Sequence, residues 1–111
     1  MEEKFGRGDI VWINFSPTQG HEQQGKRPAV VLSPQIYNDK SHLMIVAPIT
    51  NKQKGYPFEI ETKSDVITGV ILSDQIRTID WKARKVQKVG VVSDEIIKQV
   101  GQHLKLLLPV Q

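Results

Sequence analysis

Most of the chain consists of short apolar runs separated by glycine and proline. These runs are rich in valine, isoleucine and aromatic residues, a composition typical of β-strands. We expect strands at residues 9–15, 28–33, 42–49, 58–62, 69–72, 75–80 and 88–92. Several short strands divided by turn residues predict a small, strongly curved β-barrel or sandwich.

The apolar pattern changes to a helical period near the end of the chain. Ser93 is suited to cap a helix, Asp94 and Glu95 suit its positive end, and Pro109 would stop it. The apolar stripe comprises Ile96, Ile97, Val100, Leu104, Leu107 and Leu108. This helix could close one end of the barrel, or residues 106–108 could pack against a second subunit. The two interpretations are compatible.

Composition predicts an ordinary soluble domain. At 111 residues, with 39% hydrophobic and 24% charged residues, the chain suits a single domain over residues 1–111. No run approaches the roughly 18 apolar residues of a membrane span, and the first residues show no signal peptide. The chain has no cysteine, which excludes disulfides and thiolate metal sites and fits a cytoplasmic protein. A net charge of +3 favours nucleic acid only slightly.

The segment before the second predicted strand carries an acid and an arginine. Glu22 lies five residues before Arg27, within a loop that contains glycine and directly precedes Pro28. Proline lacks an N–H donor, so Pro28 should start the strand or lie at an edge. The pair could be a salt bridge that holds the loop, or Arg27 could bind an anion on a rigid support.

A hydroxyl and two cations follow the third predicted strand. Thr50 ends that strand and precedes Asn51, Lys52 and Lys54. A threonine in this position is often only a turn residue. Together with a guanidinium, however, its hydroxyl would suit a phosphoryl group whose charge grows in the transition state.

The most basic stretch runs from residue 73 to 88. It contains Arg77, Lys82, Arg84, Lys85 and Lys88, with Trp81, Asp74 and Gln75 interleaved. Cations can follow a nucleic-acid backbone while carboxylate and amide groups read unpaired bases. By composition alone, the same stretch could be a solvated, charged turn.

The sequence offers little support for metal catalysis or for a nucleophilic side chain. His21, His42 and His103 are far apart in sequence and show no metal-ligand spacing, so we expect no metal site. His42 and His103 suit surface or strand-end positions, whereas His21 could touch a ligand. The sequence contains no glycine-rich phosphate cradle before a helix and no nucleophile elbow.

Four motifs resemble the MazF/PemK family of bacterial toxin endoribonucleases. They are GD at Gly8, P-T-x-G-x-E-Q from Pro17, G-x-R-P from Gly25 and K-G-Y-P-F from Lys54. The similarity extends from about residue 5 to residue 108. It implies an SH3-like β-barrel with a C-terminal helix, the CcdB/PemK-like toxin fold, and a homodimer.

The resemblance also implies an activity and its residues. It implies cleavage of single-stranded mRNA without a metal or other cofactor, by attack of the 2′-hydroxyl on the adjacent phosphate. The products would carry 2′,3′-cyclic phosphate and 5′-hydroxyl ends. Family catalytic positions fall on Arg27 and Thr50, Glu22 matches a loop acid linked to activity, and Asp74 and Gln75 match base-contacting positions. The RNA-binding residues that we expect are His21, Gln23, Lys52, Lys54, Asp74, Gln75, Lys82 and Arg84.

The same resemblance implies a protein partner, an antitoxin whose acidic, disordered tail folds onto the RNA groove.

Two other functions would suit the fold. One is a gyrase poison resembling CcdB, which depends on a Trp-Gly-Ile chain end, whereas this chain ends in LLPVQ. The other is a nucleic-acid-binding barrel without catalysis.

Overall fold

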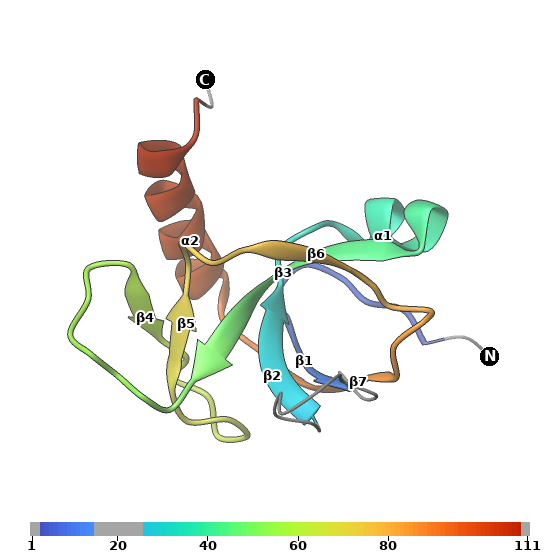
Figure 1. Cartoon of the computed structure of the whole chain (residues 1–111), viewed down its shortest axis with the longest axis horizontal. Helices are drawn as coiled ribbons and strands as arrows, with labels where there is room; N and C mark the ends of the chain where they lie inside the picture. Colours follow the sequence, from blue (N-terminus) through green and yellow to red (C-terminus); the bar gives the residue numbers. More distant parts are fainter. Residues whose placement is uncertain (1–2, 15–25, 110–111) are drawn as a thin grey trace, which may run out of the picture.

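One curved, antiparallel sheet makes up most of the molecule (Figure 1). The computed structural model describes residues 3–14 and 26–109. Within these ranges the strands are β1 (Asp9–Asn14), β2 (Lys26–Val31), β3 (Leu43–Thr50), β4 (Glu59–Glu61), β5 (Val70–Leu72), β6 (Arg77–Asp80) and β7 (Val86–Val91), and the helices are α1 (Gln35–Ser41) and α2 (Asp94–Leu107). Every strand expected from the sequence is present, with ends shifted by a few residues.

Strand β3 organises the sheet because it pairs with three neighbours. One of its edges pairs with β2. Its other edge is shared, since the first half of β3 pairs with β6 and the end of β3 pairs with β5. The strand order is β4-β5-β3-β2-β1-β7, with β6 beside β3. Among the described residues, β4 and β7 end the sheet without pairing to one another, so the predicted barrel is strongly curved and not a closed ring.

Both faces of the central strands β1, β2 and β3 contribute to the core. Neighbouring residues of β1, Ile10 and Val11, belong to different hydrophobic clusters, and so do Val30 and Val31 of β2. Side chains alternate between the two faces of a strand, so a strand buried on both faces is apolar throughout. This explains the nearly continuous apolar runs in the sequence of β1 and β3.

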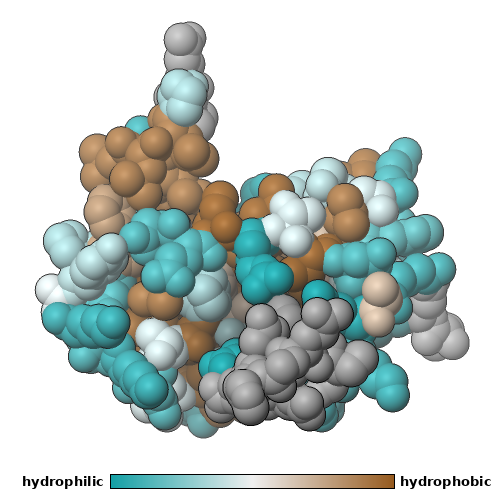
Figure 2. All heavy atoms as spheres, viewed as in Figure 1, coloured by the Kyte–Doolittle hydropathy of each residue, from teal (hydrophilic) through white to brown (hydrophobic). Residues whose placement is uncertain are grey.

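Helix α2 covers one of these faces, as its apolar stripe predicts. Ile96 and Val100 are buried in the cluster that contains Ile10. The hydroxyl of Ser93 accepts a hydrogen bond from the N–H of Ile96 at 3.3 Å, which confirms the expected cap. The far end of α2 projects from the sheet, and Figure 2 shows it as an apolar surface. Leu106 is 77% exposed there, so packing of residues 106–108 against a second subunit remains a prediction.

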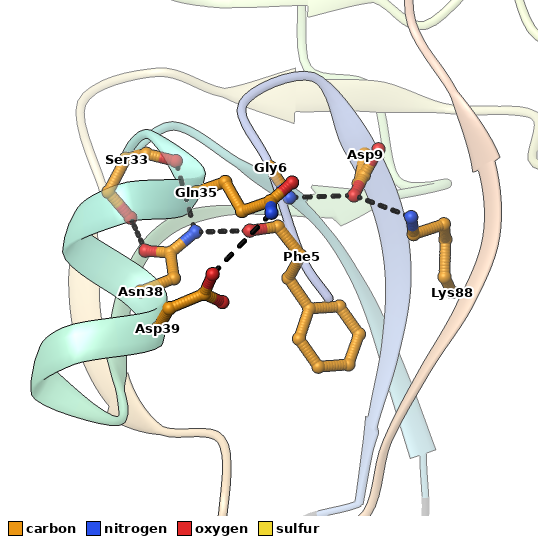
Figure 3. Close-up of polar contacts among 8 residues, drawn as sticks. All are labelled: Phe5, Gly6, Asp9, Ser33, Gln35, Asn38, Asp39 and Lys88. Atoms are coloured by element: carbon orange, nitrogen blue, oxygen red, sulfur yellow. Dashed lines mark hydrogen bonds and ion pairs between the residues drawn. The ribbon is translucent and has the colours of Figure 1, made fainter. Parts of the chain in front are cut away.

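The short helix α1 was not expected from the sequence. Its one buried residue is Asn38, whose amide donates to the carbonyl oxygens of Phe5 at 2.8 Å and Ser33 at 3.1 Å (Figure 3). The indole N–H of Trp81 donates to the Asn38 carbonyl at 2.9 Å. A polar anchor therefore attaches α1 to the body of the protein, and the apolar pattern could not reveal it.

Candidate active site

Arg27 and Thr50 line one pocket because β2 and β3 separate beside them. The last paired residues of these two strands are Ala29 and Pro48. Pro28 pairs only toward β1, opposite Trp12, which confirms its expected place at a local edge. Beyond this point a pocket of about 270 Å³ opens. Its lining includes Trp12, Arg27, Pro28, Ile49, Thr50, Asn51 and Thr68. In Figure 1 the start of β2 and the arrowhead of β3 lie at the same end of the sheet.

The hydroxyl of Thr50 is fixed by the turn that follows β3. Its oxygen accepts a hydrogen bond from the backbone N–H of Lys52 at 3.1 Å. This confirms the turn role considered from the sequence. A hydroxyl that accepts one hydrogen bond can still donate its own proton. The turn therefore leaves Thr50 able to donate to an anion in the pocket.

Thr50 also lines a second pocket, of about 330 Å³. The predicted RNA-binding residues Lys52, Lys54 and Gln75 line this second pocket, with Tyr56 and Glu59. Thr50 is thus shared by a pocket that Arg27 lines and a pocket that two lysines line. Adjacent pockets lined by cations and hydrogen-bond donors suit an extended polyanion.

A carboxylate missed in the sequence organises the loop between β3 and β4. Glu59 accepts hydrogen bonds from the backbone N–H groups of Lys54 at 3.0 Å, Gly55 at 3.0 Å and Tyr56 at 3.2 Å. These bonds, that of Lys54 foremost, hold the pKa of the Glu59 carboxyl below its usual value. Gly55 has φ +76°, a conformation that favours glycine. The K-G-Y-P-F motif and the following glutamate therefore encode a preformed loop.

The loop presents Tyr56 to Asp74. The phenol O–H donates to Asp74 Oδ2 at 3.2 Å, and the nearby carboxylate raises the pKa of Tyr56. The other oxygen, Asp74 Oδ1, is buried and accepts no hydrogen bond from the described residues. Burying an acceptor without a donor is unfavourable by roughly 1–3 kcal/mol. Asp74 thus turns one carboxylate oxygen toward Tyr56 and keeps the other below the surface.

Lys82 and Arg84 lie apart from the two pockets, in the turn between β6 and β7. Asp80 shapes the turn by accepting from the backbone N–H groups of Lys82 at 3.0 Å and Ala83 at 2.9 Å. The end of the turn lies beside the end of β1, since the N–H of Asn14 donates to the Lys85 carbonyl at 3.3 Å. Strand β1 therefore separates this basic turn from Arg27.

Three further predicted residues, His21, Glu22 and Gln23, lie outside the described ranges. The pairing of Glu22 with Arg27 and the contacts of the loop with RNA stay predictions. Of the other two histidines, His103 contacts the Ser73 hydroxyl at 2.7 Å and His42 packs edge-on against Trp81.

Residues 3–14 and 26–109 contain no cluster of three or more histidine or acidic side chains able to hold a metal ion. Neither described helix is long and apolar enough to span a membrane.

Comparison with known proteins identifies the family. The family model described as "PemK-like, MazF-like toxin of type II toxin-antitoxin system" matches residues 6–108. The chain belongs to this family. It is 43% identical over 101 residues to the endoribonuclease toxin MazF of Escherichia coli K12, covering 91% of each chain. It is 38% identical over 113 residues to the endoribonuclease toxin ChpB of the same strain, covering 96% of this chain and 97% of that protein.

The fold agrees with solved structures of PemK-like, MazF-like toxins. One crystal structure of MazE-MazF from Deinococcus radiodurans superposes with a TM-score of 0.92 at 38% identity, covering 99% of this chain and all of that one. The expected mainly-β fold with a C-terminal helix is therefore confirmed. The family membership also favours a toxin nuclease over a gyrase poison or a barrel without catalysis.

Proposed function

We propose that this chain is the endoribonuclease toxin of a type II toxin-antitoxin system, and that it cleaves single-stranded RNA at the Arg27–Thr50 pocket. The observation that carries the proposal is that Arg27 and Thr50, 23 positions apart in sequence, line one pocket beside a lysine-lined one. A guanidinium and a hydroxyl aimed at one phosphate stabilise the charge that develops during phosphoryl transfer.

The reaction needs no nucleophile from the protein. The 2′-oxygen of the RNA forms a bond to the adjacent phosphorus as the bond from phosphorus to the 5′-oxygen breaks. The 2′-hydroxyl loses its proton and the departing 5′-oxygen gains one, which leaves a 2′,3′-cyclic phosphate and a 5′-hydroxyl. In this scheme Arg27 contacts the phosphate and Thr50 hydrogen-bonds it. Glu22 accepts the 2′-hydroxyl proton or holds Arg27 in place, and no metal takes part.

The second pocket supplies contacts to bases. Lys52 and Lys54 are exposed cations suited to RNA phosphates, and Gln75 can both donate and accept at a base edge. Asp74 holds Tyr56 of this pocket, and its carboxylate would accept an amino or imino N–H of a base once the side chain turns outward. Lys82 and Arg84 would contact a more distant part of the strand.

The partners follow from the same surface. A cytoplasmic homodimer would bind RNA and an antitoxin, whose acidic tail would compete for Lys52 and Lys54. One of the solved relatives from Deinococcus radiodurans is a structure of MazE-MazF. Undiminished binding of RNA and antitoxin at the same time would contradict this overlap.

The direct test is incubation of the pure protein with a long RNA in excess EDTA. We expect discrete fragments with 2′,3′-cyclic phosphate and 5′-hydroxyl ends. Intact RNA, or cleavage that returns only when a divalent metal is added, would overturn the proposal.

A further inference from the structure

A third cavity adjoins the proposed cleavage pocket and shares no lining residue with the pocket that contains Gln75. This groove, of about 580 Å³, lies between the turn after β3 and the loop that joins β4 to β5. Its lining includes Asn51, Gln53, Glu61, Lys63, Asp65 and Thr68, and we call it the β4–β5 groove. Asn51 and Thr68 also line the Arg27–Thr50 pocket, so the two cavities share a wall.

The loop that forms the groove is preformed. The hydroxyl of Thr62 donates to the Ile67 carbonyl at 2.8 Å, and the Ser64 hydroxyl accepts from the N–H of Val66 at 3.1 Å. Ile67 is buried in the hydrophobic core. A groove that exists before its ligand arrives binds with a smaller entropic cost than one that must be ordered.

The chemistry of the lining favours the base of a nucleotide over a phosphate. Glu61 and Asp65 provide two negative charges against the single positive charge of Lys63, which disfavours a bare anion. The amides of Asn51 and Gln53 each carry donors and acceptors, as the polar edge of an unpaired base requires. The described lining has no aromatic side chain, so recognition here would rely on hydrogen bonds in place of stacking.

We propose that the β4–β5 groove binds one unpaired nucleotide of the RNA, on the opposite side of the cleaved phosphate from the nucleotide beside Tyr56 and Gln75. The proposal rests on the proposed function, because the shared wall of Asn51 and Thr68 places the groove next to the scissile phosphate. Its volume lies within the roughly 300–1,000 Å³ of small-molecule sites. Gln53 and Asp65 would determine which base is accepted.

The test combines a groove variant with shortened substrates. After the preferred site is mapped in a long RNA, synthetic oligonucleotides centred on it are shortened one nucleotide at a time from each end. We expect Gln53→Ala to lower kcat/KM about tenfold on the full oligonucleotide, the effect of one base contact. The loss should vanish on the oligonucleotide that lacks the groove nucleotide, where the wild type should itself cleave about tenfold less well.

The matched control is Gln102→Ala, which removes another exposed glutamine, from α2. Equal activity of the two variants on every oligonucleotide would overturn the proposal, as would a Gln53→Ala loss that persists at every length. Normal cleavage with weakened antitoxin inhibition would also overturn it, because the groove would then belong to the protein partner.

A second variant tests base recognition. Asp65→Asn replaces an acceptor by a group that also donates, so we expect it to change the preferred base at the groove position alone. An unchanged preference among the four bases there would count against the role of Asp65. If the wild type cleaves no RNA, the proposed function is wrong, but the proposal about the groove can still be tested. Binding of mixed-sequence single-stranded RNA oligonucleotides of decreasing length to the wild type and to Gln53→Ala then decides on the groove, because this measurement needs no cut site.

Discussion

Gly69 lies against the backbone of Thr50, so closely that a Cβ atom at position 69 would stand 2.5 Å from the Thr50 carbonyl oxygen. Gly69 also has φ +150°, which L side chains rarely adopt. The residue is therefore a spacer that lets β5 pair with the end of β3 where Thr50 lines the two pockets.

Gly69→Ala should displace Thr50 and slow RNA cleavage on the order of 10²-fold, the usual effect of moving a catalytic group by about 1 Å. The control is Gly101→Ala in α2, where an added Cβ meets nothing within 4 Å. This control should keep full activity and gain roughly 0.5–1 kcal/mol of stability, since alanine favours a helix. Cleavage rates and thermal unfolding of both variants check the prediction. Wild-type cleavage by Gly69→Ala would show that Thr50 needs no such spacer.

Glu59→Gln should weaken the loop at residues 54–56, because a neutral amide accepts the three backbone N–H groups less strongly than a carboxylate. We expect a higher KM for RNA with little change in kcat, since Lys54 and Tyr56 line the second pocket and not the one that holds Arg27. A fall in kcat at unchanged KM would contradict this assignment.

The lowered pKa of Glu59 also predicts a pH dependence. A carboxyl with a lowered pKa stabilises the fold above its ordinary value of 4.5, and this contribution disappears as the pH falls through the lowered value. The difference in Tm between wild type and Glu59→Gln should therefore be constant near neutral pH and shrink below 4.5. Parallel Tm curves down to strongly acidic pH would rule out this role of the carboxylate.

Asp74 should keep Tyr56 protonated above its ordinary pKa of 10.0, because the carboxylate repels a phenolate and accepts the phenol proton. The chain has two tyrosines, so a Tyr37→Phe background leaves Tyr56 as the single one. In that background, Asp74→Asn should lower the Tyr56 pKa, measured by the ultraviolet absorbance of tyrosinate. An unchanged titration curve would mean that the two side chains are not in contact in solution.

The sequence predicted the strands and α2 because their buried residues are apolar and follow clear periods. It missed α1, whose one buried residue is the polar Asn38. Arg27 and Thr50, the cation and hydroxyl of the candidate site, were singled out from the sequence, and the family resemblance implied a catalytic role for both. Their meeting in one pocket depends on how β2 pairs with β3 and where that pairing stops at Ala29 and Pro48, which local sequence does not determine.

The supporting residues were harder to predict for the same reason. In the sequence, Glu59 looks like an ordinary strand residue. In the structure, the turn at Gly55 brings three backbone N–H groups to its carboxylate. The role of Gly69 depends on a contact with Thr50, 19 positions earlier. Both roles arise from tertiary contacts and not from a local pattern.

The central claim is that Arg27 acts on the scissile phosphate, and the most direct measurement is the rate of RNA cleavage by Arg27→Ala under single-turnover conditions in EDTA. Lys98→Ala, which removes an exposed cation from α2, is the control for net charge. We predict that Arg27→Ala folds normally and cleaves on the order of 10²-fold or more slowly, whereas Lys98→Ala matches the wild type. A cleavage rate of Arg27→Ala close to that of the wild type would contradict the account.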